Sequence, residues 1–303
     1  MHVLVARGAA DLRGLRRRFP GLRLSEFEKW PDVGQAVRHE VCGVVLRSTP
    51  RITEKDLLDL PALRWVIRPG SGTDNIDLTA LRRRGITFVR RPEISADAIA
   101  EIALMSTLVV LRRAAEGFRG LTAGVHLKAR CMGRTLAGSR VAIWGAGPVG
   151  RATGLLFDRY GAAVRYARWP SNPGHLAQAD ADRLRAESDI HVVALPLRPE
   201  TTGIVDAAWL AKAAPRRPVL TCVGRMETLD LVGVAAALRA GQLFGLAIDP
   251  VDDEHVMAVG ELLSAAPNVF VTPHVGGQRG DVRTELDRWV EGSIAERLEE
   301  VRV

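Results

Sequence analysis

The fold is decided by the stretch Val141-Ala142-Ile143-Trp144-Gly145-Ala146-Gly147-Pro148-Val149-Gly150. Its apolar start predicts a buried strand, and the Gly-x-Gly-x-x-Gly spacing predicts a turn that opens a helix. Gly145 would allow the tight turn, Gly147 the approach of a pyrophosphate, and Gly150 close packing of helix on strand. The helix N-terminus would face the anion. We therefore expect a dinucleotide to contact Gly145, Gly147, Pro148, Val149 and Gly150; a purely structural turn is the alternative.

Short apolar runs recur on both sides of this stretch, with helical patterns between them. Strands that alternate with helices predict an α/β fold with parallel, doubly wound sheets. A first series of strands occupies residues 1 to 92, and a second ends near residue 272. Between them, residues 96 to 116 predict one long apolar helix that packs between domains, and an amphipathic helix is expected from about 280 to 300.

Composition limits the partners of the chain. With 303 residues, 47% of them hydrophobic, it is long enough for two domains. The formal charge of +7 suits several kinds of anion, but the arginine runs 16–18 and 82–84 lack interleaved aromatic residues and indicate solvated helix faces. The three cysteines lack metal-ligand spacing and indicate reduced thiols. No apolar run suits a signal peptide or a membrane span, so we expect a soluble cytoplasmic protein without a membrane partner. For the reasons above we expect neither a metal nor a nucleic-acid partner.

The end of the second strand of the dinucleotide unit indicates which dinucleotide binds. An NAD-selective unit carries a carboxylate there, about 20 residues past the glycines, to hold the ribose 2′-hydroxyl. This chain has Arg168, whose planar fork would pair with a 2′-phosphate, and Ser171 and Asn172 would add hydrogen bonds. The sequence therefore predicts a preference for NADP(H), with NAD(H) and a solvated arginine as the alternative.

Three later stretches follow strands of the second series and carry reactive side chains: Arg225, Glu254 and His274. Ligands of open parallel sheets bind beyond the carboxyl ends of the strands, so these side chains would converge. Reduction of a 2-oxo acid needs a cation for the carboxylate and carbonyl, which Arg225 would supply, and an acid that titrates near neutrality, which suits His274. A nearby carboxylate such as Glu254 would orient the imidazole and stabilise its protonated form.

With these residues in place, the chain resembles the D-isomer-specific 2-hydroxyacid dehydrogenases over nearly its whole length. The resemblance rests on Arg47-Ser48, Gly70-Ser71-Gly72-Thr73-Asp74-Asn75-Ile76-Asp77, Ala100-Glu101, the glycine turn, Ser188-Asp189-Ile190, Leu195-Pro196-Leu197, Pro199-Glu200-Thr201, Gly224-Arg225 and Thr272-Pro273-His274. It implies an oxidoreductase that transfers hydride between a nicotinamide and the alpha carbon of a small 2-oxo or 2-hydroxy acid, with D specificity.

The resemblance also implies an architecture: a Rossmann cofactor domain, residues 94–277, inserted in a flavodoxin-like substrate domain, residues 1–93 plus 278–303. In this family the helix and loop near 100 to 138 usually form a homodimer interface, so we expect a homodimer.

Residue roles follow from the same resemblance. The equivalents of Arg225, Glu254 and His274 form the catalytic triad, and the residue that matches Asp249 contacts the nicotinamide carboxamide. The substrate site would comprise Arg47, Ser71, Gly72, Arg225 and His274. Arg68 and Arg47 resemble basic residues that hold a substrate phosphate, so the oxo acid is either phosphorylated or phosphonate-bearing, or a simpler one such as glyoxylate or hydroxypyruvate. We also assign to the cofactor site Leu195, Pro196, Val223, Asp249, His274 and Gly276.

Some positions depart from the family pattern. Met226-Glu227 follow the arginine where small residues are usual, Cys222 stands where asparagine is frequent, and His255 replaces a proline. Arg91-Pro92-Glu93 also replaces a usual Pro-Gly step. These departures leave open a dinucleotide-sensing binding protein, such as a corepressor, that has lost turnover. An S-adenosylmethionine-dependent methyltransferase would share only the glycine turn.

Overall fold

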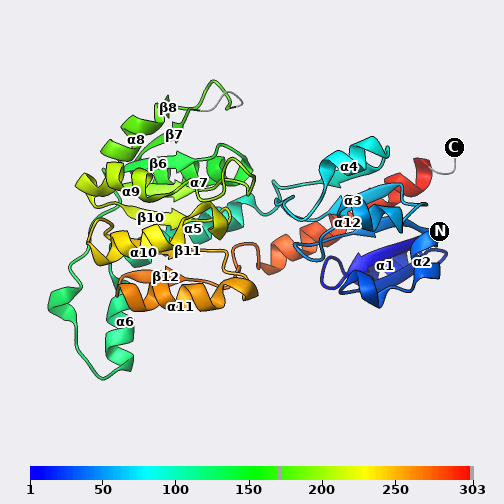
Figure 1. Ribbon diagram of the computed structural model, residues 1–303, viewed down its shortest axis with the longest axis horizontal. Helices are drawn as coiled ribbons and strands as arrows, with labels where there is room; N and C mark the ends of the chain where they lie inside the picture. Colours follow the sequence, from blue (N-terminus) through cyan, green and yellow to red (C-terminus); the bar gives the residue numbers. More distant parts are fainter. Residues whose placement is uncertain (169–171, 301–303) are drawn as a thin grey trace. The chain divides into compact units, whose positions relative to one another are not determined.

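The computed structural model describes residues 1–168 and 172–300, in two units (Figure 1). Unit 1 comprises Met1–Ser95 and Arg279–Val303, and unit 2 comprises Ala96–Gln278. Within the described residues, unit 1 holds a five-stranded parallel sheet in the order β2-β1-β3-β4-β5, and unit 2 a seven-stranded parallel sheet in the order β12-β11-β10-β9-β6-β7-β8. Both sheets are doubly wound, as the sequence predicts.

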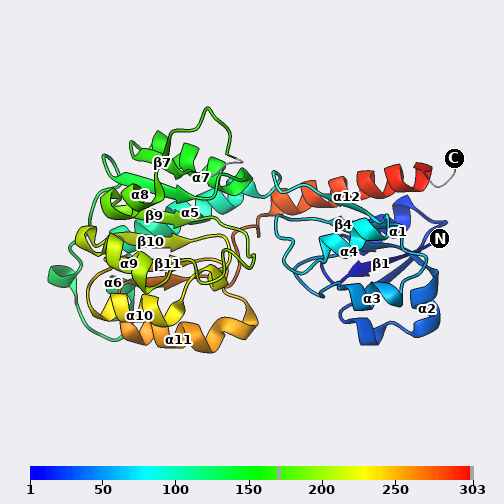
Figure 2. The ribbon, with the colours of Figure 1, turned by 45° about the horizontal axis from the view of Figure 1, so that its top comes forward.

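The order of strands in unit 1 is that of flavodoxin-like folds. Its core includes Val290 and Ile294 of the last helix, which packs on β4 and runs alongside the sheet (Figure 2). The strands are β1 (His2–Ala6), β2 (Arg23–Phe27), β3 (Val41–Val45), β4 (Trp65–Arg68) and β5 (Thr87–Arg90). The helices are α1 (Leu12–Arg18), the 3-10 helix η1 (Trp30–Asp32), α2 (Gln35–Glu40), α3 (Glu54–Leu58), α4 (Leu78–Arg83) and α12 (Gly280–Glu300).

Unit 2 contains the glycine turn, and its strands wind outward from β6 in the two directions typical of a Rossmann fold. The strands are β6 (Arg140–Trp144), β7 (Ala163–Ala167), β8 (Gln178–Ala179), β9 (Ile190–Val193), β10 (Val219–Cys222), β11 (Gly245–Ile248) and β12 (Val269–Val271). The α-helices are α5 (Ala96–Leu111), α6 (Ala114–Thr122), α7 (Pro148–Arg159), α8 (Ala181–Glu187), α9 (Ala207–Ala213), α10 (Leu231–Arg239) and α11 (Val256–Ala265). Short 3-10 helices are η2 (Lys128–Arg130), η3 (Ala214–Arg216), η4 (Met226–Thr228) and η5 (Asp253–His255).

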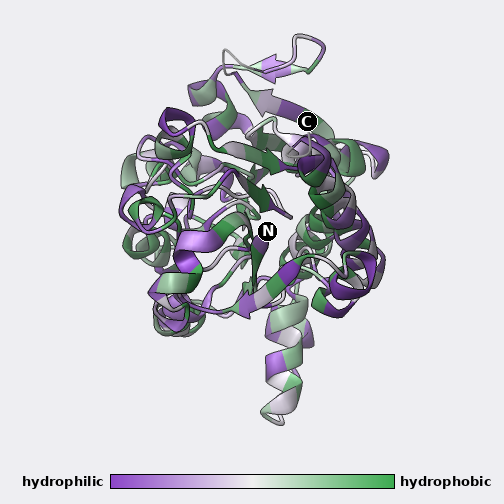
Figure 3. Cartoon of the chain, turned by 90° about the vertical axis from the view of Figure 1, so that its right-hand side faces the viewer, coloured by the Kyte–Doolittle hydropathy of each residue, from purple (hydrophilic) through white to green (hydrophobic). Residues whose placement is uncertain are grey.

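The sheet of unit 2 is buried on both faces, because successive residues of a strand point to opposite sides. In β6, Val141 and Ile143 join the core that includes Phe157 of α7. Ala142 and Trp144 join the opposite core, with residues of α8, α9 and α10. Figure 3 shows hydrophobic strand segments in the sheets and hydrophilic segments among the surrounding helices. Because the side chains of β6 enter both cores, the strand is apolar at successive positions instead of alternating between apolar and polar residues.

The sequence predicts one long helix over residues 96–116, and this prediction is wrong, because the structure has two helices there. Helix α5 ends at Leu111, and Arg113, with φ of 52°, is in the left-handed region that non-glycine residues rarely adopt. The Arg113 guanidinium donates to the buried carboxylate of Glu116 at 2.7 Å and lies 5.5 Å from the centre of the Phe244 ring. These contacts hold the bend. Among the described residues, no helix is both long enough and apolar enough to cross a membrane.

Candidate active site

The glycine turn has the shape that a pyrophosphate requires. Gly145 has φ of +107°, and a side chain at Gly150 would place Cβ 1.8 Å from the Gly145 carbonyl oxygen. A Cβ built on Gly147 meets no atom within 4 Å, so the outer side of the turn is open. Helix α7 begins at Pro148, and its first N–H groups have no acceptor within the helix. The turn therefore fits a dinucleotide in the way that its sequence predicts.

The end of β7 presents Arg168 as an exposed side chain, and its backbone N–H donates to Ala179 at 3.0 Å. Asn172 donates from its side-chain amide to the Ala167 carbonyl at 2.8 Å and to Gln178 at 3.3 Å. Both hydrogen bonds of this amide are therefore made within the chain. Ser171, the other residue expected near a 2′-phosphate, lies outside the described residues.

The loops after β9 and β10 lie against each other. The N–H groups of Val223 and Gly224 donate to the Val193 carbonyl at 2.9 and 3.1 Å. A side chain at Gly224 would place Cβ 2.3 Å from the Leu195 carbonyl oxygen. This close approach lines up Leu195, Pro196 and Val223 along one edge of the sheet, which is where the sequence places the cofactor. Leu195 is half-buried and Pro196 is exposed.

The backbone of Arg225 is held from within its own loop. The Thr228 hydroxyl donates to the Arg225 carbonyl at 2.6 Å, and the Cys222 thiol donates to the same oxygen at 3.3 Å. Burial raises the pKa of the Cys222 thiol to about 11, so this group stays protonated at neutral pH. The Arg225 guanidinium donates to the Gly224 carbonyl at 2.9 Å. Cys222, which departs from the family pattern, thus supports the arginine.

Asp249 fixes the loop that carries the histidine. It is buried after β11, and its carboxylate accepts from the Thr272 hydroxyl at 2.6 Å, the Val275 N–H at 2.9 Å and the Gly276 N–H at 3.0 Å. A side chain at Gly276 would place Cβ 2.7 Å from an Asp249 oxygen, so glycine allows this approach. His274, between these contacts, has φ of 54°. Such strain in a non-glycine residue is typical of functional loops.

The hydrogen-bond partner of His274 differs from the one expected from the sequence. His274 Nδ1 lies 2.7 Å from Asp252 Oδ1, so Asp252 orients the imidazole. Glu254, which was expected to do so, lies on η5 with its side chain 76% exposed, and its carboxylate is 4.0 Å from His255 Nε2. The short η5 turn directs Glu254 toward its neighbour and leaves Asp252 beside the histidine. The sequence signal for Asp252 was only its place in an acidic run after a strand.

The Asp252 carboxylate lies within electrostatic reach of both His274 and Arg225. The hydrogen bond from His274 lowers the pKa of Asp252, and the positive charges of His274, Arg225 and His255 lower it further. A guanidinium and an imidazole from different strand ends therefore act on one carboxyl group. This arrangement suits a carbonyl substrate that carries a carboxylate, since a cation and a proton donor are both present.

Arg47, one of the predicted residues of unit 1, forms a basic group with Arg283 of α12. Burial lowers the pKa of Arg47, and the charge of Arg283 on α12 lowers it further. Arg283 donates to the Gly8 carbonyl at 2.5 Å, and sequence reasoning missed it because its helix lies at the far end of the chain. Arg68 is buried and donates to the Pro69 carbonyl at 3.0 Å. Ser71 and Gly72 are half-buried in the loop after β4.

Comparison with known proteins gives the family. The chain is 29% identical over 261 residues to the D-3-phosphoglycerate dehydrogenase of Mycobacterium leprae, covering 84% of this chain and 49% of that protein, so it spans about half the length of this relative. It is 28% identical over 280 residues to the hydroxyphenylpyruvate reductase of Plectranthus scutellarioides, covering 90% and 88%. The structure superposes on a D-lactate dehydrogenase from Aquifex aeolicus, complexed with NAD and lactic acid, with a TM-score of 0.86, 18% identity, and coverage of 99% and 97%.

A family model described as the NAD binding domain of D-isomer specific 2-hydroxyacid dehydrogenases matches residues 104–276, and this range contains the glycine turn, Arg225, Asp252 and His274. The match covers more than half of the chain and confirms the resemblance found in the sequence. The chain belongs to the D-isomer specific 2-hydroxyacid dehydrogenase family.

Proposed function

We propose that this protein is an NAD(P)-dependent oxidoreductase that transfers hydride between the nicotinamide and the alpha carbon of a small 2-oxo or 2-hydroxy acid, with D specificity. The observation that carries the proposal is the His274–Asp252 pair, at 2.7 Å, on strand-end loops that share one electrostatic environment with Arg225. The glycine turn, open at Gly147, supports a dinucleotide in the same unit.

In the direction of reduction, the Arg225 guanidinium binds the carboxylate of the oxo acid and polarises its carbonyl. A reduced nicotinamide dinucleotide, whose pyrophosphate Gly145, Gly147 and Gly150 would hold, would supply the hydride. Protonated His274 donates its proton to the carbonyl oxygen, so the ketone becomes an alcohol, and the imidazole regains a proton from solvent. Asp252 holds the ring in place and stabilises its protonated form. Glu254 stays a predicted catalytic residue by family resemblance, although Asp252 makes the contact with the ring.

We propose NADP(H) as the preferred cofactor because Arg168, a permanent cation at the end of β7, stands where an NAD-selective unit carries a carboxylate. The substrate would be anionic. The basic group of Arg47 and Arg283 in unit 1 supports a second anionic function on it, such as a phosphate or phosphonate, and glyoxylate or hydroxypyruvate is the simpler choice.

We further propose a cytoplasmic homodimer. The free thiols Cys42, Cys131 and Cys222 suit a reducing compartment. Helix α6 exposes Phe118 and Leu121, at 69% and 65%, beside a hollow of about 360 Å³ that is lined mainly by apolar residues of α6, α11 and β12. Apolar side chains exposed together are typical of interfaces.

The direct test is a spectrophotometric screen of NADPH and NADH oxidation with glyoxylate, hydroxypyruvate, phosphohydroxypyruvate, phosphonopyruvate and bulkier oxo acids. We expect turnover with at least one of them, faster with NADPH. Cofactor binding without turnover on any acid would contradict the proposed enzyme and favour a binding protein that senses the dinucleotide.

A further inference from the structure

The turn after Arg225 is fixed through its backbone. This turn is the 3-10 helix η4, which begins directly after the arginine. The Gly203 N–H donates to the Glu227 carbonyl at 2.9 Å, and the Val205 N–H donates to the Thr228 carbonyl at 3.1 Å. Both bonds come from the segment that precedes α9, and neither depends on a side chain of η4. The turn therefore offers a stable support for the residue before it.

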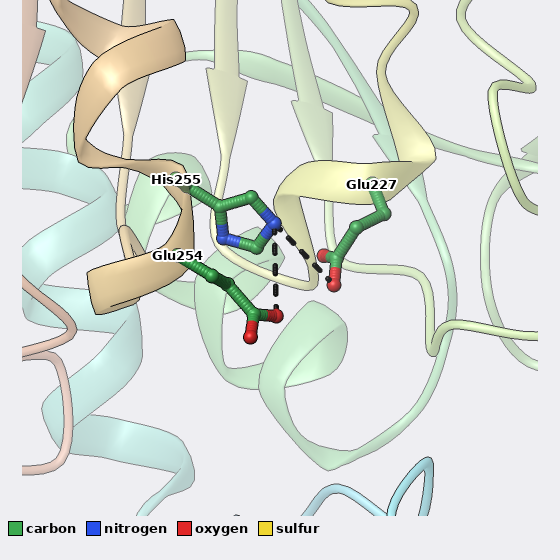
Figure 4. A group of neighbouring side chains, drawn as sticks. All are labelled: Glu227, Glu254 and His255. Carbon is green, nitrogen blue, oxygen red and sulfur yellow. Dashed lines mark ion pairs between the residues drawn. The ribbon is translucent and has the colours of Figure 1, made fainter.

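Two side chains of η4 add contacts with neighbouring parts of unit 2. Met226 is 1% exposed and joins the core that includes residues of α9 and α10. The Glu227 carboxylate lies 3.8 Å from His255 Nε2 on η5, an ion pair drawn in Figure 4. Small residues usually follow the arginine in the family, and here the bulk of Met226 lies inside the core. The departure at Met226 therefore anchors the turn.

Thr228 is the residue of η4 that bonds to Arg225 through a side chain. It is fully buried, and its hydroxyl donates to the Arg225 carbonyl at 2.6 Å, while its backbone N–H donates to the same oxygen at 3.1 Å. The Cys222 thiol donates to this oxygen at 3.3 Å. A hydroxyl is a stronger donor than a thiol, and 2.6 Å is at the short end of the range for such bonds. The hydroxyl therefore makes the shortest of the three bonds that hold this carbonyl.

Hydrogen bonds thus fix the backbone on both sides of the Arg225 alpha carbon. On the N-terminal side, the Val223 and Gly224 N–H groups donate to the Val193 carbonyl. On the C-terminal side, Thr228 holds the Arg225 carbonyl. The rotamers that a side chain can adopt depend on the backbone dihedral angles at its own residue. The bond from Thr228 therefore helps to determine where the guanidinium lies.

We propose that Thr228 is a positioning residue, whose hydroxyl holds the Arg225 backbone so that the guanidinium meets the carboxylate of the oxo acid. The proposal rests on the proposed function, because it concerns the binding of that substrate. Asparagine is frequent in the family at the position of Cys222, and its amide would be a stronger donor than the thiol of this chain. Thr228 supplies the strong donor that Cys222 does not. Bidentate binding of a carboxylate depends on such exact placement of the guanidinium.

The test compares variants of the full chain by steady-state kinetics with NADPH and the acid of the screen that turns over fastest. Thr228→Val keeps the shape of the side chain and removes the hydroxyl. We expect the KM for the oxo acid to rise roughly two- to tenfold, the range that one hydrogen bond spans, and the KM for NADPH to stay at its wild-type value. Thr228→Ser keeps the hydroxyl and should have the wild-type KM for both.

Thr221→Val is the matched control for the loss of a buried hydroxyl. Thr221 lies on β10, is fully buried, and its hydroxyl is 2.8 Å from that of Thr107. Its loss should lower the Tm but leave the KM for the oxo acid unchanged, because a smaller fraction of folded enzyme lowers the apparent kcat and not KM. Thr228→Val should fold, since the Arg225 carbonyl keeps two donors. Thr228→Ala removes the same hydroxyl and serves as the second variant.

Hydrogen exchange followed by mass spectrometry gives a readout that needs no substrate. The amides of residues 224–230 should exchange faster in Thr228→Val and Thr228→Ala than in the wild type, and at the wild-type rate in Thr221→Val. The inference is overturned if both variants of Thr228 keep the wild-type exchange, or if both keep the wild-type KM for the oxo acid. A wild type that turns over no acid contradicts the proposed function instead, and the exchange rates then decide whether Thr228 holds the arginine loop.

Discussion

Asp252 Oδ1 and His274 Nδ1 lie 2.7 Å apart, which joins the loop after β11 to the loop after β12. The two residues are held from independent directions. Asp252 begins the turn into η5, and the loop around His274 is fixed to Asp249 by hydrogen bonds from the Thr272 hydroxyl and from two backbone N–H groups. This leaves Nε2 of the imidazole for the proton transfer that we propose.

Substitution of Asp252 distinguishes it from Glu254 as the positioning residue. We expect Asp252→Asn to lower kcat/KM roughly 10- to 100-fold, because the amide no longer stabilises the protonated imidazole. Glu254→Gln should lower kcat/KM less. A larger loss in Glu254→Gln would return the role to the residue expected from the family.

The same pair makes stability depend on pH. The hydrogen bond from His274, with nearby positive charges, holds the pKa of Asp252 below its ordinary value of 3.8. A carboxyl group with a lowered folded-state pKa stabilises the fold above its ordinary pKa and loses this contribution as pH falls through the folded value. The wild type should therefore resist urea better than Asp252→Asn at pH 7. The difference should shrink as pH falls below about 4; a constant difference would show that the charge is not its source.

Replacement of the proton donor tests the chemistry itself. His274→Ala should lower kcat roughly 100- to 10,000-fold, the range that a general acid contributes. Binding of NADPH, followed by nucleotide fluorescence, should persist, because the glycine turn lies on a different part of the sheet. The exposed His126→Ala serves as control and should keep full activity. Survival of turnover in His274→Ala would show that another group delivers the proton.

The parts of the fold that follow local rules could be predicted from the sequence. Strand β6 (Arg140–Trp144) contains the apolar stretch from Val141 that predicts a strand, and α12 (Gly280–Glu300) lies where an amphipathic helix is expected. Two other strands are hard to predict from the sequence. Strand β2 (Arg23–Phe27) lies at the edge of its sheet and buries only Leu24 and Phe27, and β8 (Gln178–Ala179) has only two residues. An edge strand pairs through its backbone, so its side chains carry little signal.

The sequence predicts which loops carry the candidate site, but not which side chains form hydrogen bonds with each other there. The glycine turn is determined by spacing, and the strand-end loops of Arg225 and His274 follow from the parallel sheet. The choice between Asp252 and Glu254 depends on how η5 turns, which is a tertiary outcome. The bend at Arg113 likewise depends on Glu116 and Phe244, and Phe244 is far away in the sequence. Contacts between distant segments leave no periodic trace in a single sequence.

Cofactor preference should follow the charge at the end of β7. Arg168→Asp is expected to shift the ratio of kcat/KM for NADPH over NADH toward NADH by at least about tenfold, because a charged hydrogen bond to the 2′-phosphate contributes about 1.5 to 3 kcal/mol. Arg165→Asp changes an exposed arginine within β7 by the same charge and should leave the ratio near that of the wild type. Equal or better use of NADH by the wild type would contradict the assignment of Arg168.

Alanine substitutions at two glycines of the same turn should have different effects, one on stability and the other on cofactor affinity. At Gly150 the new Cβ would lie 1.8 Å from the Gly145 carbonyl oxygen, so the backbone must move. We expect a loss of roughly 1 to 3 kcal/mol in the free energy of unfolding, seen as a lower Tm. At Gly147 the Cβ meets nothing within 4 Å, and φ of −68° with ψ of −179° suits alanine.

Gly147→Ala should therefore melt at the wild-type Tm, but its methyl group fills the space that the pyrophosphate needs. We expect its affinity for NADPH to fall at least about tenfold, because the backbone of the turn no longer approaches the phosphates. Gly260→Ala, also with nothing within 4 Å of its Cβ, is the matched control for both measurements. Wild-type affinity in Gly147→Ala would mean that the dinucleotide does not cross this turn, because the methyl group projects into no other part of the chain.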